Sequence, residues 1–214
     1  MIFRQLFDPE SSTYTYLLAD GGEAVLIDPV MEQLERDLRL LGELNLQLRY
    51  CLDTHVHADH VTAAGSLRTR TGCKTAVCGS AGVACADIPL SNGDTLSVGQ
   101  HTIEVRATPG HTNGCMTYVL DDGQQIRAFT GDTIFIRGCG RTDFQGGDAA
   151  TLYQSVHTQI FTLPDNAIIY PGHDYKGHHQ STVGEEKAHN PRLNVSISKD
   201  EFIQIMDNLK LSNP

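Results

Sequence analysis

The sequence lacks a long apolar segment, because none of its apolar runs approaches the roughly 18 residues of a transmembrane helix. It begins without the pattern of a signal peptide or of an Arg- and Ser-rich transit peptide. Internal repeats, low-complexity stretches and a Pro- and Ser-rich linker are also missing. These absences favour a cytoplasmic protein with no membrane partner. They predict a single domain over residues 1–214, with a short C-terminal extension from about residue 176.

Positive charge is also scarce, with 16 Lys and Arg against 26 Asp and Glu and a formal net charge of −10. Proteins bind nucleic acids by neutralising phosphates with Lys and Arg, and no basic tract is present, so we expect no nucleic-acid partner. The cysteines have no CxxC spacing, and in this setting we expect reduced thiols rather than a disulfide framework. The six cysteines are Cys51, Cys73, Cys78, Cys85, Cys115 and Cys139.

The sequence does contain many short strand-like runs interrupted by helical patterns. Apolar, β-branched and aromatic residues between Gly, Asn and Asp turns predict strands at 2–7, 13–19, 23–28, 46–54, 74–79 and 167–171, with a further series at about 95–131. Helical spacing predicts helices at 34–44 and 61–71, after the N-cap Asp148, and after a capping box of Ser198 and Glu201. Several strands followed by a helix indicate two sheets covered by helices.

The strongest signal for chemistry is the run THVHADH at residues 54–60, which follows a predicted strand. A helix would spread residues i and i+2 over different faces, so this spacing is typical of an irregular loop around a metal. The clustering of three histidines and an aspartate argues against a merely solvated polar loop. The four metal-competent side chains are His55, His57, Asp59 and His60.

Three other predicted strands also end at a metal-competent side chain. TIEVRAT is followed by His111, RAFT by Asp132 and AIIY by His173. Each of these residues alone would more often be a hydrogen-bonded loop residue. Because sites are commonly built from loops at strand ends, the four strand ends together predict one site assembled from across the chain.

The motifs HxHxDH, PGHT, GD and PGHD, in this order, resemble the metallo-β-lactamase superfamily over about residues 10–175. The resemblance implies an α/β fold, namely an αββα sandwich of two mixed β-sheets flanked by helices, with a metal at the edge between the sheets. Within the superfamily, IRGCGRTDF (136–144) and NPRL (190–193) resemble the persulfide dioxygenase, or sulfur dioxygenase, branch. The nearest related branch is glyoxalase II.

The two branches imply different metal sites from nearly the same residues. In persulfide dioxygenases one Fe(II) per chain is held by the residues that match His55, His111 and Asp132, a triad that leaves coordination positions open. Glyoxalase II holds two metals, and its bridging hydroxide attacks a thioester. The additional glyoxalase II ligands match His57, Asp59, His60 and His173. All of these residues are present, so ligand identity leaves one metal and two metals both open.

Two features favour the dioxygenase branch. Arg141-Thr142-Asp143 stands where glyoxalase II usually has a Lys and an aromatic residue, and few residues follow His173, where glyoxalase II continues into a helical substrate-binding domain. We therefore expect an oxidoreductase that converts glutathione persulfide, O₂ and water into glutathione and sulfite at a mononuclear Fe(II). In that enzyme the four additional residues would orient ligands or hold water. The alternative is a hydroxyacylglutathione hydrolase with a binuclear site.

The expected substrate is anionic and the protein is acidic, so the mouth of the site should be locally positive. Arg141 is the preferred substrate contact because a guanidinium can bind a carboxylate with two hydrogen bonds, and Tyr175 adds a hydroxyl donor. Arg137 and Lys176 are weaker candidates. Asp143 is expected to orient Arg141 or a metal ligand.

Two cysteines lie near the ligand motifs in the sequence. Cys115 and Cys139 could exchange sulfur with a persulfide, or they could be small buried apolar residues, and the sequence leaves their role open. The family resemblance also implies a homodimer.

Overall fold

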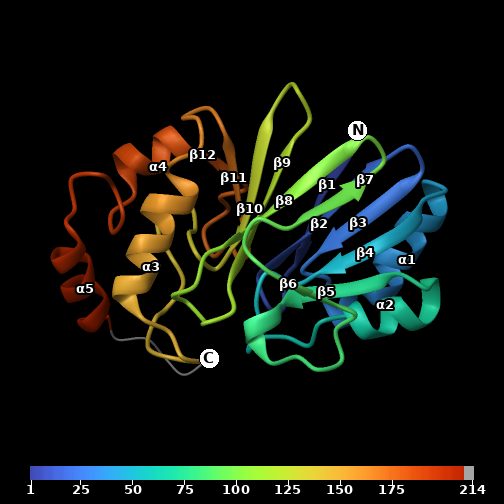
Figure 1. Cartoon of the computed structure of the whole chain (residues 1–214), viewed down its shortest axis with the longest axis horizontal. Helices are drawn as coiled ribbons and strands as arrows, with labels where there is room; N and C mark the ends of the chain where they lie inside the picture. Colours follow the sequence, from blue (N-terminus) through green and yellow to red (C-terminus); the bar gives the residue numbers. More distant parts are fainter. Residues whose placement is uncertain (210–214) are drawn as a thin grey trace.

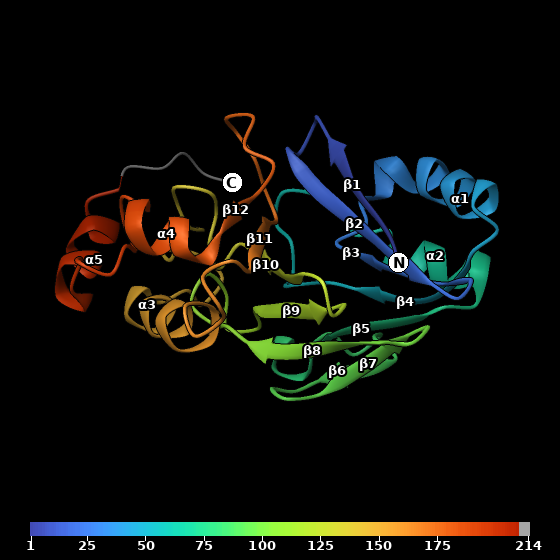
Figure 2. The same ribbon diagram turned by 90° about the horizontal axis from the view of Figure 1, so that it is seen from above.

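The computed structural model describes residues 1–209, which form four layers: helices, a sheet, a second sheet and helices. From left to right, Figure 1 shows α3–α5, the two sheets, and then α1 and α2. Figure 2 shows that the two groups of helices lie at opposite ends of the molecule. This architecture is the αββα sandwich predicted from the sequence.

Each sheet has six strands and is mixed. In the first sheet β1–β3 pair antiparallel and β3–β6 pair parallel. In the second sheet only β10 and β11 pair parallel. The first sheet contains β1 (Ile2–Asp8), β2 (Thr13–Asp20), β3 (Glu23–Ile27), β4 (Gln47–Leu52), β5 (Lys74–Cys78) and β6 (Ile88–Leu90). The second contains β7 (Thr95–Val98), β8 (His101–Ala107), β9 (Met116–Asp121), β10 (Ile126–Gly131), β11 (Ile168–Pro171) and β12 (Ser181–Thr182).

Four of the helices agree with the predicted positions, with differences at their ends, whereas α4 was not predicted from the sequence. The helix expected at 61–71 begins only at Ala64, because the residues before it form the irregular loop. The helix capped by Asp148 continues from Ser155 into a π-helical turn. The helices are α1 (Leu34–Glu43), α2 (Ala64–Thr71), α3 (Ala149–Ser155), α4 (Val183–His189) and α5 (Lys199–Asp207), with short turns η1 (Met31–Gln33), η2 (Gly79–Ala81) and η3 (Val156–Ile160). Within residues 1–209, no helix is both long and apolar enough to cross a membrane.

Alternation along β2 shows how the core is built. Tyr16 and Leu18 belong to the apolar cluster that includes side chains from both sheets, while Leu17 and Ala19 belong to the cluster with side chains from α1 and α2. Successive strand residues point to opposite faces, so one buried strand contributes to both clusters. A third cluster joins the second sheet to α3–α5, and Phe202 of α5 is fully buried in it.

Backbone contacts join the two sheets at the edge where the four motif-bearing strands end. The N–H of Tyr14, in β2, donates to the carbonyl oxygen of Gly172 at 2.8 Å, and the N–H of Met116 donates to that of Thr54 at 2.8 Å. Gly172 follows β11, and a Cβ atom there would lie 2.6 Å from Oδ1 of Asp132. The glycine of PGHD is therefore required because the backbone passes so close to this carboxylate.

Candidate metal centre

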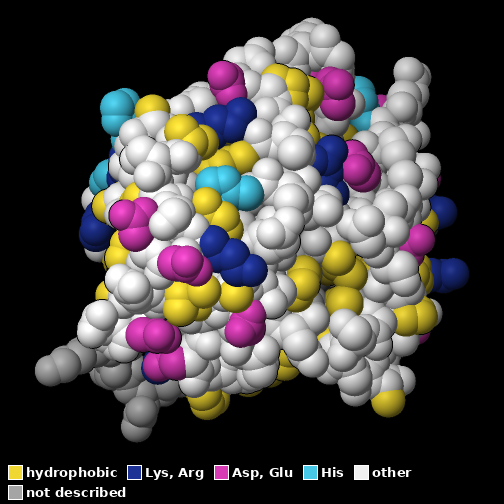
Figure 3. Space-filling view, turned by 60° about the vertical axis from the view of Figure 1, so that its left-hand side comes forward, with side chains coloured by type: hydrophobic (Ala, Val, Ile, Leu, Met, Phe, Trp, Pro, Cys, Tyr) yellow, Lys and Arg dark blue, Asp and Glu magenta, His cyan; other side chains and the backbone are white. Residues whose placement is uncertain are grey.

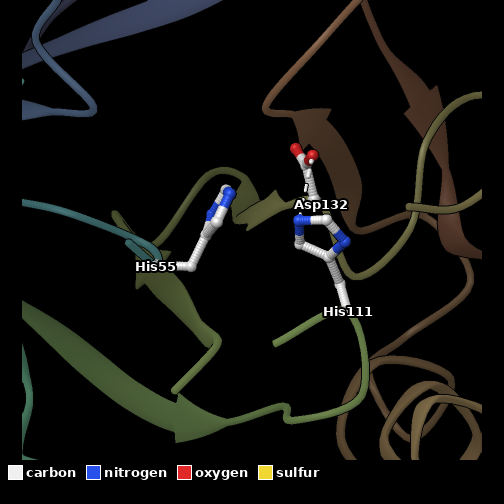
Figure 4. A group of neighbouring side chains, drawn as sticks. All are labelled: His55, His111 and Asp132. Atoms are coloured by element: carbon white, nitrogen blue, oxygen red, sulfur yellow. Dashed lines mark ion pairs between the residues drawn. The ribbon is translucent and has the colours of Figure 1, made fainter. Parts of the chain in front are cut away.

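Two histidines and an aspartate from both sheets meet at this edge (Figure 4). His55 follows β4 of the first sheet, whereas His111 and Asp132 follow β8 and β10 of the second. One ligand atom from each lies within 4.8 Å of the others, and the three residues are 2–8 % exposed. Two imidazoles and one carboxylate with converging donor atoms fit one metal ion with open coordination positions.

Hydrogen bonds orient the two histidines. Nδ1 of His111 donates to the carbonyl oxygen of Arg141 at 2.8 Å, which directs Nε2 toward Asp132, 3.5 Å from its Oδ2. The hydroxyl of Thr54 donates to Asp28 at 2.8 Å and is therefore an acceptor for Nδ1 of His55, 3.0 Å away. Partners of this kind fix the tautomer of a metal-binding histidine, and both rings present Nε2 to the centre.

Asp28, which follows β3, organises the loop and was missed by the sequence analysis. It is 1 % exposed and accepts hydrogen bonds from the N–H and hydroxyl of Thr54 at 2.7 and 2.8 Å. Nε2 of His57 lies 3.1 Å from the same carboxylate. The strand-end pattern could have found Asp28, because it directly follows the run EAVLI.

A second set of residues forms a hydrogen-bonded chain beside the triad. Oδ2 of Asp59 lies 2.8 Å from Nδ1 of His60 and 2.9 Å from Nε2 of His173. Nδ1 of His173 lies 2.8 Å from Oδ1 of Asp132. His57, Asp59 and His60 also have ligand atoms within 4.8 Å of one another. The structure thus brings together every residue that the motifs predicted for the site.

Charge distinguishes the histidines as potential ligands. Burial, with a further contribution from His57, lowers the pKa of His55 to about 3, so its imidazole is neutral. Burial alone would also lower the pKa of His57 and of His173, but Asp28 raises the former to about 9 and Asp132 raises the latter to about 10. A neutral imidazole such as that of His55 has a lone pair available for a metal.

A pocket of about 480 Å³ opens onto the triad. The guanidinium of Arg141 lines it and makes two hydrogen bonds with Asp143, Nε to Oδ1 at 2.7 Å and Nη2 to Oδ2 at 2.9 Å. The ring of Tyr175 stacks on His173 with centroids 5.8 Å apart, and Lys176 also lines the pocket. Arg137 lines it too, but its guanidinium is paired with Glu185 and Glu186 in α4.

Arg192 of the NPRL segment also lines the pocket, and the sequence analysis did not place it there. Its Nη1 lies 3.5 Å from the carbonyl oxygen of Cys139. The only sequence signal for Arg192 was the resemblance of NPRL to the persulfide dioxygenase branch. On the face shown in Figure 3, basic and acidic side chains are interspersed, so positive charge there is local.

The two cysteines near the ligand motifs are buried thiols. Burial raises the pKa of Cys115 to about 12 and that of Cys139 to about 11. The sulfur of Cys115 accepts from the N–H of Thr112 at 3.3 Å, and that of Cys139 contacts Met206 at 3.8 Å. Because the thiolate is the reactive form, these contacts favour structural roles for both.

Residues 8–173 match the model of the metallo-beta-lactamase superfamily, and the chain belongs to this superfamily. Within it the chain belongs with the ETHE1 persulfide dioxygenases. It is 54 % identical to the mitochondrial persulfide dioxygenase ETHE1 of Mus musculus, over 100 % of this chain and 84 % of that protein. The crystal structure of ETHE1 from Myxococcus xanthus is 53 % identical, with a TM-score of 0.95 over 100 % of this chain and 93 % of that one. These matches confirm the predicted fold class and branch.

A more distant solved structure bears on the number of metals. TTHA1623 in a di-iron-bound form is 27 % identical, with a TM-score of 0.70 over 89 % of this chain and 99 % of that one. The superfamily fold therefore accommodates an iron pair in a relative at lower identity.

Proposed function

We propose that this chain is an Fe(II)-dependent persulfide dioxygenase, which oxidises glutathione persulfide with O₂ and water to glutathione and sulfite. The observation that carries the proposal is the convergence of His55, His111 and Asp132 in one pocket of a chain 54 % identical to a persulfide dioxygenase over its whole length. The identity favours this function over the thioester hydrolase, which shares the fold.

The residues present would hold one Fe(II) through Nε2 of His55, Nε2 of His111 and the carboxylate of Asp132. When bound, Fe(II) supplies open positions for sulfur and O₂ and stabilises charge that develops on oxygen. The chain itself fixes the ligand geometry, because Thr54 and the backbone of Arg141 hold the two rings. Holding the persulfide and O₂ next to each other in the pocket would make their reaction effectively intramolecular.

Substrate binding is assigned to the wall of the same pocket. Asp143 holds the Arg141 guanidinium there, where it would attract a glutathione carboxylate, and Tyr175 offers its hydroxyl. The pocket is large enough to enclose much of a tripeptide, since ligand pockets typically measure about 300–1,000 Å³. Lys176 and Arg192 add positive charge to a site in an otherwise acidic protein.

Three further predictions belong to this proposal. We expect a homodimer, a cytoplasmic location and one domain over residues 1–214 that includes the C-terminal extension from about residue 176. The relative from Mus musculus is named as a mitochondrial protein. Fractionation of the source cells and the mass of the purified protein in solution test the first two of these predictions.

Anaerobic purification followed by two assays tests the activity. We expect about one iron per chain, and O₂ uptake with glutathione persulfide that matches sulfite formation mole for mole. Lactoylglutathione should remain uncleaved by the same sample. Two metals per chain together with thioester cleavage that needs no O₂ would identify the hydrolase instead.

A further inference from the structure

Two buried cysteines lie in contact at the two ends of the segment that carries the HxHxDH motif. Cys51 is in β4, Cys73 follows α2, and their sulfur atoms are 3.6 Å apart. The two residues are 0 % and 4 % exposed and belong to the apolar cluster between the first sheet and its helices. The separation corresponds to two thiols in contact, since a disulfide bond measures about 2.05 Å.

The fold brings these two sulfur atoms together through strand pairing. In the parallel pairing of β4 with β5, Cys51 lies opposite Thr75, two residues after Cys73. The other buried thiols have different contacts, so the two sulfurs form a distinct pair within the described residues. Those contacts are Cys78 with Ser80, Cys115 with Thr112, and Cys139 with Met206.

We propose that Cys51 and Cys73 form a reversible disulfide when the protein meets hydrogen peroxide. The Cys73 thiolate attacks one peroxide oxygen and the O–O bond breaks, which gives a sulfenic acid and one water after protonation. The Cys51 sulfur then attacks the sulfenic sulfur, and a second water leaves as the S–S bond forms. Two thiols and one peroxide thus give one disulfide and two waters, and a dithiol reductant reverses the reaction.

The surroundings assign different roles to the two sulfurs. The hydrogen bond between them lowers the pKa of Cys73 and, with burial, raises the pKa of Cys51. Cys73 is 4 % exposed and follows α2, whereas Cys51 is 0 % exposed inside β4, so Cys73 is the sulfur that the peroxide reaches and Cys51 is the resolving thiol. The small exposure of Cys73 selects a small oxidant, whereas Cys85, which is exposed, is open to bulky reagents.

A bond between these residues would close the ends of the segment 52–72, which contains the HxHxDH loop and α2. Such a link restricts the unfolded chain and stabilises the folded state. Under oxidising conditions the disulfide would therefore stabilise the segment that carries His55, the metal ligand from the first sheet. This role is independent of the persulfide oxygenation proposed above.

The test uses the iron-loaded protein with Cys85→Ser, so that the exposed thiol does not join two molecules. After brief peroxide treatment, catalase and alkylation, a tryptic digest should contain peptide 50–68 joined to peptide 71–74. Dithiothreitol should separate the two peptides. The oxidised protein should also melt roughly 5–10 °C above the reduced protein.

The matched control is Cys73→Ser in the same background, chosen because Cys73 lies in the link between α2 and β5 whereas Cys51 lies inside a strand. The folded control, verified by circular dichroism, should give neither the joined peptides nor the rise in melting temperature. Peroxide treatment that leaves both thiols alkylated, or takes Cys73 to a sulfinic acid without a link, would overturn the proposal. A joined protein that melts no higher than the reduced one would overturn the stabilising role. Neither result depends on oxygenase activity.

Discussion

Asp132 has a different neighbour at each of its two carboxylate oxygens. Oδ2 lies 3.5 Å from Nε2 of His111, and Oδ1 lies 2.8 Å from Nδ1 of His173. Burial would raise the pKa of this carboxyl group, but His173 and the other nearby histidines hold it well below its usual range. Asp132 is therefore ionised, and it can bind a metal while its other oxygen fixes the orientation of His173.

Replacing Asp132 tests its assignment as a ligand. In Asp132→Ala we expect the iron content of the purified protein to fall at least about tenfold, because a ligand is lost and two buried histidines lose their counter-charge. Iron per chain is measured by mass spectrometry after gel filtration. The control is Asp174→Asn, a nearby aspartate whose carboxylate contacts the Tyr14 hydroxyl at 3.3 Å and the N–H of Lys176 at 2.8 Å. Equal iron in both variants would contradict the assignment.

Arg141 is expected to act on substrate affinity. Losing a hydrogen bond to a charged group costs about 1.5–3 kcal/mol, so Arg141→Ala should raise the KM for glutathione persulfide roughly tenfold to a hundredfold. The kcat should change little, because the guanidinium contacts the substrate's tail and not the reacting sulfur. Arg141→Lys keeps the positive charge but lacks the planar guanidinium, so its KM should lie between those of the unmodified protein and Arg141→Ala. A KM unchanged by the alanine substitution refutes the contact.

At the scale of elements, the strands that deliver ligands could be predicted because each is a short apolar run that ends abruptly at polar residues. The positions of His55 and His111 followed from this pattern, and family resemblance identified the branch. Asp28 also follows a strand end, but its role and the place of Arg192 could not be predicted in the same way, because their contacts depend on tertiary packing. Asp28 bonds Thr54 across 26 positions, and Arg192 reaches the pocket from a segment after α4.

The loop between β8 and β9 packs against α3 and requires glycine at position 110 for two reasons. Gly110 has φ +137°, and a Cβ atom there would lie 2.3 Å from Cα of Leu152 in α3. Gly110→Ala should therefore lower the free energy of unfolding by roughly 3 kcal/mol or more, from backbone strain and overpacking together. Gly123, with φ +81° and nothing within 4 Å, provides the control, and its replacement by Ala should cost only about 1 kcal/mol. Urea denaturation measures both; equal losses would show that close packing at Gly110 contributes nothing.

The hairpin between β9 and β10 should respond to pH through Asp122. Partial burial raises the pKa of this carboxyl group, but hydrogen bonds from Arg127 and from the N–H groups of Gln125 and Gln124 lower it from 3.8 to about 2. A lowered folded-state pKa stabilises the protein above about pH 4, and this stabilisation is lost as pH falls toward 2. After allowance for solvent screening, Asp122→Asn should cost about 1 kcal/mol at pH 6.

Urea denaturation of the Asp122→Asn variant and the unmodified protein at pH 6 and pH 3 provides the measurement. The difference in free energy of unfolding between the two proteins should be smaller at pH 3 than at pH 6. At pH 3 part of the Asp122 carboxylate is protonated, so its interactions with Arg127 contribute less. A gap of the same size at both pH values would mean that the Arg127 ion pair contributes no pH-dependent stability.

At the scale of the whole molecule, the candidate metal centre is a junction between two sheets. His55 comes from the first sheet, and His111 and Asp132 come from the second. The interior between the sheets is apolar, with Tyr16 and Phe129 in contact at a centroid distance of 5.0 Å. A metal bound by all three residues would therefore add a link between the layers at the edge where the apolar core ends.

Metal removal tests this link. A ligand that binds only the folded state stabilises it by an amount that grows with its concentration over its dissociation constant, about 2.7 kcal/mol at a hundredfold excess. Chelation should therefore lower the melting temperature of the iron-loaded protein by roughly 5–10 °C, and added Fe(II) under nitrogen should restore it. Asp132→Ala should melt at the same temperature with and without chelator, because it holds no metal to lose. If the unmodified protein loses its iron with no change in melting temperature, a metal held by His55 and Asp132 does not stabilise the contact between the two sheets.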